Sequence, residues 1–121
     1  MDRMIFVGLG GAVGAMCRYA VSLIPWRGEF PVLTLVTNLA GALFIGILTG
    51  VAQGRGTIPP DFLLFLKTGV CGGFTTFSTF SLEAFTLIER GDRLFATVYV
   101  LLSVAGCIFG VWLGIRAGSR I

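Results

Sequence analysis

The chain has 121 residues, 55% of them hydrophobic and only 12% charged, with a formal net charge of +3. So few charges exclude a disordered chain and disfavour a soluble domain, which is typically about 25% charged. The basic residues are scattered and form no stripe, which argues against a nucleic-acid partner. We therefore expect an integral membrane protein that has the lipid bilayer as its solvent.

Four apolar segments are long enough to cross a bilayer, whose hydrocarbon core needs about 20 residues of helix. They cover residues 4–24, 32–52, 62–88 and 94–115, and turns rich in proline, glycine or charge separate them. These segments leave no length for a soluble domain, so residues 1–121 are predicted to form one four-helix transmembrane domain. The first segment lacks a small-residue cleavage site and is not expected to be a signal peptide.

Small residues recur four positions apart in three of these segments, and this spacing lets helix backbones approach closely in lipid. The first segment has Gly10 with Gly14 and Gly11 with Ala15, the second has Asn38, Ala42, Gly46 and Gly50, and the fourth has Gly106, Gly110 and Gly114. The repeats predict helix packing. Because glycine is common in transmembrane helices generally, they predict no chemistry.

The third segment is unusual because glycine, threonine and serine dominate residues 69–81. Gly72 and Gly73 stand near its middle, and each glycine weakens a helix by about 1 kcal/mol. We expect the helix to break there at mid-membrane, which would free carbonyl groups for a hard cation such as Na⁺. The alternative is an intact helix whose threonines bond back to their own turn.

Positive charge is almost evenly divided between the two sides of the predicted domain. With four spans both termini share a side, which carries Arg3, Arg55, Arg116 and Arg120, whereas the other side carries Arg27, Arg90 and Arg93. Arg18 and Lys67 lie within spans. This balance is typical of a protein that inserts in both orientations and pairs as an antiparallel dimer. A single orientation with a weak signal is the alternative.

Polar side chains inside the spans are candidate functional positions, since such groups are costly in lipid. They are Arg18 in the first span, Asn38 in the second, Glu83 with the flanking Thr76 and Thr79 in the third, and Tyr99 and Ser103 in the fourth. Helical spacing places Phe77 and Phe80 on the face of Glu83, and Cys107 on that of Tyr99 and Ser103. The alternatives are interhelical hydrogen bonds for Tyr99 and Ser103, and snorkelling to the interface for Arg18 and Glu83.

These groups suit an ion pathway better than an active site. The chain has no histidine, no paired carboxylates and no serine with a base partner, so we expect no enzyme. Phenylalanine ring edges are positive, and amide or hydroxyl donors replace part of an anion's hydration. The three cysteines, Cys17, Cys71 and Cys107, form no CxxC pair and are predicted to be small buried residues.

Three motifs resemble the Fluc/CrcB family of fluoride channels, and the resemblance covers essentially the whole chain. The motifs are Gly10-Gly11-x-x-Gly14-Ala15-x-x-Arg18-Tyr19, Thr37-Asn38-x-x-Gly41 and the specific run GGFTTFSTF at residues 72–80. The resemblance implies an all-α protein of the cell membrane with four transmembrane helices, the third broken at mid-membrane. It also implies an antiparallel, dual-topology homodimer with two fluoride pores.

The resemblance also implies roles for individual residues. The fluoride pathway would comprise Asn38, Phe77, Phe80, Thr79, Ser78, Thr76, Tyr99, Ser103, Glu83 and Arg18, with Thr79 as the preferred hydroxyl contact and Arg18 as an anion attractor. Gly72 and Thr75 match positions whose carbonyl groups bind a structural sodium ion shared by two copies of the chain. Cys107 stands where a serine would also suit a pore. The implied function is passive fluoride export that reduces fluoride toxicity.

Two other kinds of protein have this size and this number of spans. A small multidrug-type exporter would need a membrane-embedded glutamate in its first span, where this chain has Arg18 and no acid. Proton coupling would then rest on Glu83 alone. A non-transporting assembly subunit would need only the small-residue repeats.

Overall fold

The computed structural model describes residues 2–54 and 58–121, and within these ranges every regular element is a helix, which confirms the predicted all-helical class. Three long helices are apolar enough to cross a membrane, namely α1 (Asp2–Ser22), α2 (Val32–Gly54) and α6 (Arg93–Gly118). They occupy the segments predicted at 4–24, 32–52 and 94–115. Arg55, which was counted on the side of the termini, lies outside the described residues.

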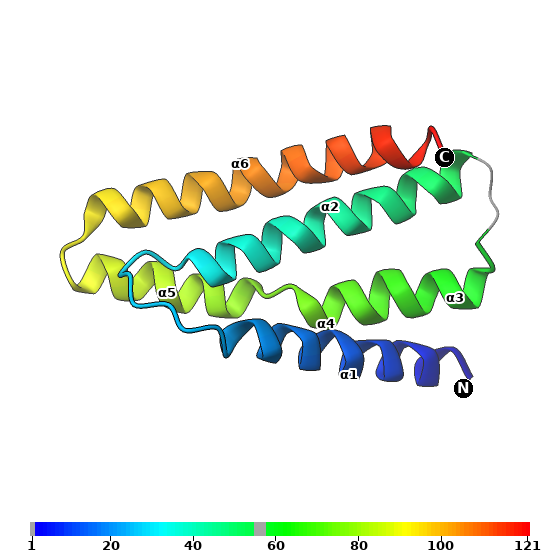
Figure 1. The fold of residues 1–121 in the computed structure, drawn as a ribbon, viewed down its shortest axis with the longest axis horizontal. Coiled ribbons are helices and arrows are strands. Elements are labelled where there is room, and N and C mark those ends of the chain that lie inside the picture. The colour runs from blue at the N-terminus through cyan, green and yellow to red at the C-terminus, as the bar shows by residue number, and fades with distance from the viewer. Residues whose placement is uncertain (1, 55–57) are drawn as a thin grey trace.

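Shorter elements make up the path between α2 and α6. They are α3 (Pro60–Leu64), the π-helix η1 (Phe65–Cys71), α4 (Gly72–Phe74) and α5 (Phe77–Glu89). Figure 1 shows these elements following one another along one line, with α3, η1 and α4 beside α1 and α5 continuing past its end, and with both chain termini at the same end of the molecule. Together they occupy the segment predicted at 62–88.

The predicted break at Gly72 and Gly73 is wrong in position. Both residues are helical, and the extended backbone comes at Thr75 (φ −83°, ψ 156°) and Thr76 (φ −148°, ψ 116°). Gly73 lies so close to α1 that an added Cβ would approach the amide nitrogen of Ala15 to 3.0 Å. The glycine therefore serves the contact between two helices, and the interruption falls on the threonines that follow it.

Glycine makes two close helix pairs possible. In the first pair α1 lies on η1 and α4, where a Cβ added at Gly14 would be 2.7 Å from the backbone nitrogen of Phe74. In the second pair α2 lies on α6, where a Cβ at Gly46 would be 3.0 Å from the Cα of Gly114. The predicted small-residue repeats at these positions are contact surfaces between helices.

Aromatic residues anchor the loop between α1 and α2 to the end of the molecule opposite the termini. The ring of Phe30 meets the rings of Phe95 and Tyr99 edge-on, with centroids 5.6 Å apart in both pairs. The indole nitrogen of Trp26 donates a hydrogen bond to the carbonyl oxygen of Phe30 (2.8 Å). Beneath them lies the buried core, formed by Leu35, Phe80, Ala84, Leu87, Ala96 and Tyr99.

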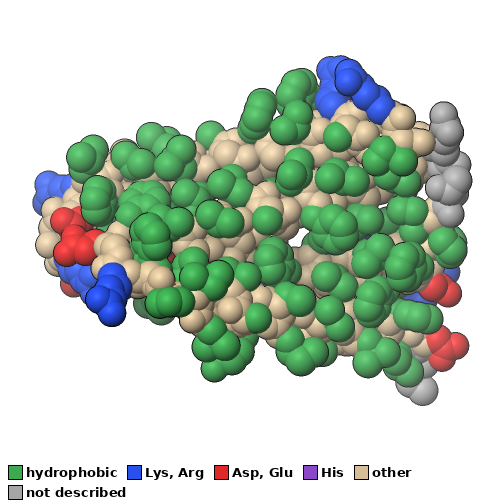
Figure 2. All heavy atoms as spheres, viewed as in Figure 1, with side chains coloured by type: hydrophobic (Ala, Val, Ile, Leu, Met, Phe, Trp, Pro, Cys, Tyr) green, Lys and Arg blue, Asp and Glu red, His purple; other side chains and the backbone are tan. Residues whose placement is uncertain are grey.

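The surface of the chain matches a lipid environment. Hydrophobic side chains cover the face shown in Figure 2, and charged side chains gather at its two ends. At the end with the termini Arg3 forms an ion pair with Asp61 (3.2 Å), and Arg116 lies over the ring of Trp112 (5.3 Å to the centroid). Cys17 is exposed on this surface, so the prediction that it is buried is wrong, while Cys71 is buried and Cys107 half-buried.

Candidate functional site

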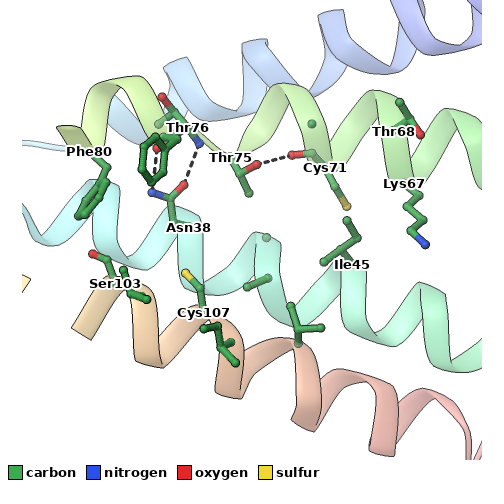
Figure 3. Close-up of a pocket in the computed structure, with 17 residues that line it drawn as sticks. Asn38, Ile45, Lys67, Thr68, Cys71, Thr75, Thr76, Phe80, Ser103 and Cys107 are labelled. Carbon is green, nitrogen blue, oxygen red and sulfur yellow. Dashed lines mark hydrogen bonds between the residues drawn. The ribbon is translucent and has the colours of Figure 1, made fainter. Parts of the chain in front are cut away.

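A cavity of about 690 Å³ lies between α2, the η1–α5 path and α6. Its walls bring together residues from segments far apart in the sequence (Figure 3). Of the predicted site residues, the lining contains Asn38, Gly72, Thr75, Thr76, Phe77, Phe80 and Ser103. Cys107 lies on the same wall as Ser103, one helical turn further along α6.

The side chain of Asn38 holds the interrupted backbone in place. Its Nδ2 donates to the carbonyl oxygen of Thr76 (3.0 Å), and its Oδ1 accepts from the Thr76 backbone nitrogen (2.8 Å). Because extended backbone has no partner within its own helix, this amide replaces the helical hydrogen bonds that Thr76 lacks. Asn38 therefore has a structural role in addition to the pore role that the resemblance implies.

The threonines of the interruption satisfy some backbone groups and leave others free. The Thr76 hydroxyl caps α5 by accepting from the Thr79 backbone nitrogen (3.1 Å), and the Thr75 hydroxyl donates to the carbonyl oxygen of Cys71 (2.9 Å). No hydrogen bond to the carbonyl oxygens of Gly72 or Thr75 is found within the described part of the chain. Both residues line the cavity, and their carbonyl groups have no partner in the described chain that would keep them from binding a ligand.

Two aromatic rings line one end of the cavity, and a third stands behind them. The Phe77 and Phe80 rings have centroids 5.4 Å apart and are tilted by 53°, and the Phe80 ring meets that of Tyr99 at 5.1 Å and 63°. Phe80 is buried, whereas Phe77 is 76% exposed. Phe80 and Tyr99 thus have fixed positions, while Phe77 extends from the surface of the single chain.

Glu83 and Tyr99 lie together behind the cavity lining. A carboxylate oxygen of Glu83 accepts from the Thr34 hydroxyl (2.6 Å), and the other accepts from the Tyr99 hydroxyl (3.4 Å). The structure brings these two predicted residues to one hydrogen-bonded cluster, with Thr34 as a member that sequence reasoning missed. Interhelical bonding, one of the alternatives for Tyr99, is observed.

Arg18, Ser78 and Thr79 do not line the large cavity. The Nε of Arg18 donates to the carbonyl oxygen of Gly73 (3.2 Å), just before the interruption, and its side chain borders a separate pocket of about 40 Å³ beside Thr34 and Thr76. The Ser78 hydroxyl lies 3.4 Å from the Thr76 hydroxyl. The guanidinium of Arg18 therefore caps a helix end in this chain.

Two lining residues complete the site. The Ser103 hydroxyl is buried and has no hydrogen-bond partner within the described residues, and the residue itself borders the cavity. Lys67 also lines the cavity, and sequence reasoning assigned it no role. The sequence feature that could have identified Lys67 is its position inside an apolar span, where an ionisable residue is a candidate functional residue by default.

Comparison with known proteins identifies the family. Residues 5–115 match the family described as CrcB-like protein, Camphor Resistance (CrcB). A protein of Methylobacterium nodulans named fluoride-specific ion channel FluC is 52% identical over 110 residues, covering 89% of this chain and 87% of its own. A protein of the same name from Rhodospirillum rubrum is 48% identical over 116 residues (91% and 89% covered), and one from Citrifermentans bemidjiense is 41% identical over 124 residues (100% of both). The chain is accordingly a multi-pass membrane protein and belongs to the CrcB-like family.

Proposed function

We propose that this protein is a fluoride-specific ion channel that lets cytoplasmic fluoride leave the cell passively. The observation that carries the proposal is the cavity between α2, α5 and α6, which gathers Asn38, Phe77, Phe80 and Ser103. The relatives named as fluoride-specific ion channels support the choice of ion.

The chemistry of the lining suits a small, strongly hydrated anion. Asn38 retains a second amide proton after bonding Thr76, and the buried, unpartnered Ser103 hydroxyl would become a further donor where a small side-chain movement opens it to the cavity. The positive ring edges of Phe77 and Phe80 add weak contacts at the same end. A series of weak contacts allows an ion to enter and leave, which a conducting pathway requires. The proposed pathway continues past Thr76, Ser78 and Thr79 toward Glu83 and Tyr99.

The functional unit that we propose is an antiparallel dimer with four spans in each copy. The elements from α3 to α5 follow one line (Figure 1) and would form the third span in chain order, broken at Thr75 and Thr76. Extended backbone at membrane depth is tolerated only when protein covers it or it lines a cavity. A second copy packed on the cavity would provide that cover, and the even charge balance suits opposite insertion.

A structural sodium ion is part of the proposal. Gly72 and Thr75 line the cavity, their carbonyl oxygens have no hydrogen-bond partner in the described chain, and carbonyl oxygens suit a hard cation. One chain contributes two such groups, so a two-fold axis would bring four to one ion. Sodium would then link the two copies and fix the interruption in both.

Passive export follows from the membrane potential. HF crosses lipid uncharged and dissociates in a near-neutral cytoplasm, which traps the anion. An inside-negative potential of 100 mV is worth about 2.3 kcal/mol per charge, or roughly fifty-fold exclusion of fluoride at equilibrium. A selective pore is therefore sufficient to reduce fluoride toxicity, and the proposal requires no catalytic step.

Ion flux from liposomes tests the proposal directly. Purified protein in vesicles loaded with fluoride in sodium-containing buffer is expected to release fluoride, and vesicles loaded with chloride to retain it. Protein-free vesicles are the control. Absence of fluoride release, or equal release of chloride, would contradict the proposal.

The exporter hypothesis makes a different prediction for one carboxylate. Glu83 is held by Thr34 and Tyr99 and does not line the cavity, so a proton-coupled cycle would have to disrupt this cluster. Glu83→Gln is expected to retain downhill fluoride flux. An exporter would lose its transport with the same substitution.

A further inference from the structure

One cation faces the cavity. Among the lining residues Lys67 is the only one with a charged side chain, and the others are apolar, hydroxyl, amide, thiol or glycine residues. Figure 3 shows Lys67 extending from η1 into the space between η1 and α2, beside Ile45. Phe80 and Ser103 stand at the opposite end of the same cavity.

The ammonium group of Lys67 has no acidic partner in the described part of the chain. The single ion pair there joins Arg3 and Asp61 near the termini, and Glu83 bonds Thr34 and Tyr99 instead. A positive side chain on the wall of a cavity whose other lining side chains are uncharged acts through a low dielectric. It therefore raises the local concentration of small anions.

The other cation in a span is occupied elsewhere. Arg18 bonds the carbonyl oxygen of Gly73 and borders the separate small pocket, so its charge does not face the cavity. From this contrast we infer that Lys67 is the charge that collects fluoride in the cavity and directs it toward Asn38 and Phe77. The inference rests on the proposed channel function and assigns the collecting role to a residue of the cavity wall.

Snorkelling is the rival role for Lys67. The residue lies about two helical turns beyond Pro60, where α3 begins, so its flexible stem would also reach a lipid phosphate at the interface. The two roles differ in their salt dependence. An anion-collecting charge acts over a distance that added salt shortens, whereas a lipid anchor affects folding and leaves the salt response of flux unchanged.

The test measures fluoride flux in neutral phosphatidylcholine vesicles with sodium present, at low and at high ionic strength set by an impermeant salt. Lys67→Met keeps most of the length of the side chain and removes its charge. It is expected to lower flux about tenfold at low ionic strength and by much less at high ionic strength. Lys67→Arg is expected to retain flux. Arg120→Gln, which removes a charge outside the cavity, is the matched control and is expected to behave as wild type.

The outcomes separate the two proposals. If Lys67→Met has the same flux as the wild type at low ionic strength, or lowers flux by the same factor at both ionic strengths, the collecting role is wrong. The channel function would be unaffected by either result. A wild type that passes no fluoride overturns both. If Lys67→Met does not fold, the wild type itself decides, because the inference requires its flux per channel to fall as salt is added, and a constant flux contradicts it.

Discussion

At the scale of single residues, the aromatic ring of Phe80 has a well-defined position on the wall of the candidate pathway. It is buried, it meets Phe77 and Tyr99, and it borders the cavity. Phe80→Ile removes the ring edge and keeps much of the apolar volume. We expect fluoride flux to fall about tenfold, the equivalent of ~1.4 kcal/mol, while the protein keeps its oligomeric state in size-exclusion chromatography.

A phenylalanine on the same helix provides the control for that substitution. Phe85 is 58% exposed and does not line the cavity, so Phe85→Ile is expected to leave flux unchanged. Undiminished flux in Phe80→Ile would refute the role of the ring edge. An equal loss in both variants would indicate a general effect on folding.

The carboxamide of Asn38 is the second residue with a testable role. Asn38→Asp keeps an acceptor for the Thr76 backbone nitrogen but removes the donor to the Thr76 carbonyl oxygen. It leaves a carboxylate facing a carbonyl oxygen, so we expect a loss of about 1–3 kcal/mol in stability, seen as a lower melting temperature in detergent. Thr49→Val is the control, because the Thr49 hydroxyl bonds only the carbonyl oxygen of Ile45 within α2. Equal melting temperatures for Asn38→Asp and wild type would refute the structural role.

At the scale of elements, glycine decides which helix faces touch. A Cβ at Gly14 meets backbone atoms of Val70, Gly73 and Phe74, which have no flexible end to move aside. We expect Gly14→Ala to lower stability by about 1–3 kcal/mol, measured as thermal unfolding in detergent.

Gly8 is the matched position on the same helix. An added Cβ there has nothing within 4 Å, and alanine is the better helix former by about 1 kcal/mol. Gly8→Ala is expected to be neutral or slightly stabilising. The packing argument would fail if both substitutions had the same effect.

The extent of the helices follows from local pattern, but the place of the interruption does not. Apolar length locates α1, α2 and α6 because a bilayer requires it. The interruption depends on contacts between distant segments, since α1 requires a close, helical Gly73 and Asn38 of α2 binds the extended Thr76. One local feature does indicate where the helix resumes. Thr76 is a residue type that favours the N-cap position, and it precedes α5 and accepts a hydrogen bond from the Thr79 nitrogen.

The side chains of the candidate site also differ in how far the sequence predicts their positions. Spacing on one helix places Ser103 and Cys107 on a shared wall, and both line the cavity. It does not show that Arg18 bonds Gly73 or that Glu83 bonds Thr34, because these pairs join different helices. Lys67 faces the cavity for the same kind of reason, since only the packing of η1 beside α2 determines its direction.

At the scale of the whole molecule, the proposed sodium ion links folding to assembly. Its proposed ligands would come from two copies, so replacing Na⁺ with N-methyl-glucamine is expected to lower both fluoride flux and the dimer fraction in detergent. Restoring Na⁺ is expected to recover both. Equal flux and equal dimer fraction in the two salts would argue against a shared cation site.

The two tryptophans stand at opposite ends of the molecule, Trp26 in the loop after α1 and Trp112 near the end of α6. Each is about half exposed. Trp26 donates a hydrogen bond to a backbone carbonyl oxygen, and the guanidinium of Arg116 lies over the ring of Trp112. The chain thus contains two native optical probes, one toward each end of the helical bundle. In single-tryptophan variants, quenching by brominated acyl chains would report how deeply each end sits, without any added dye.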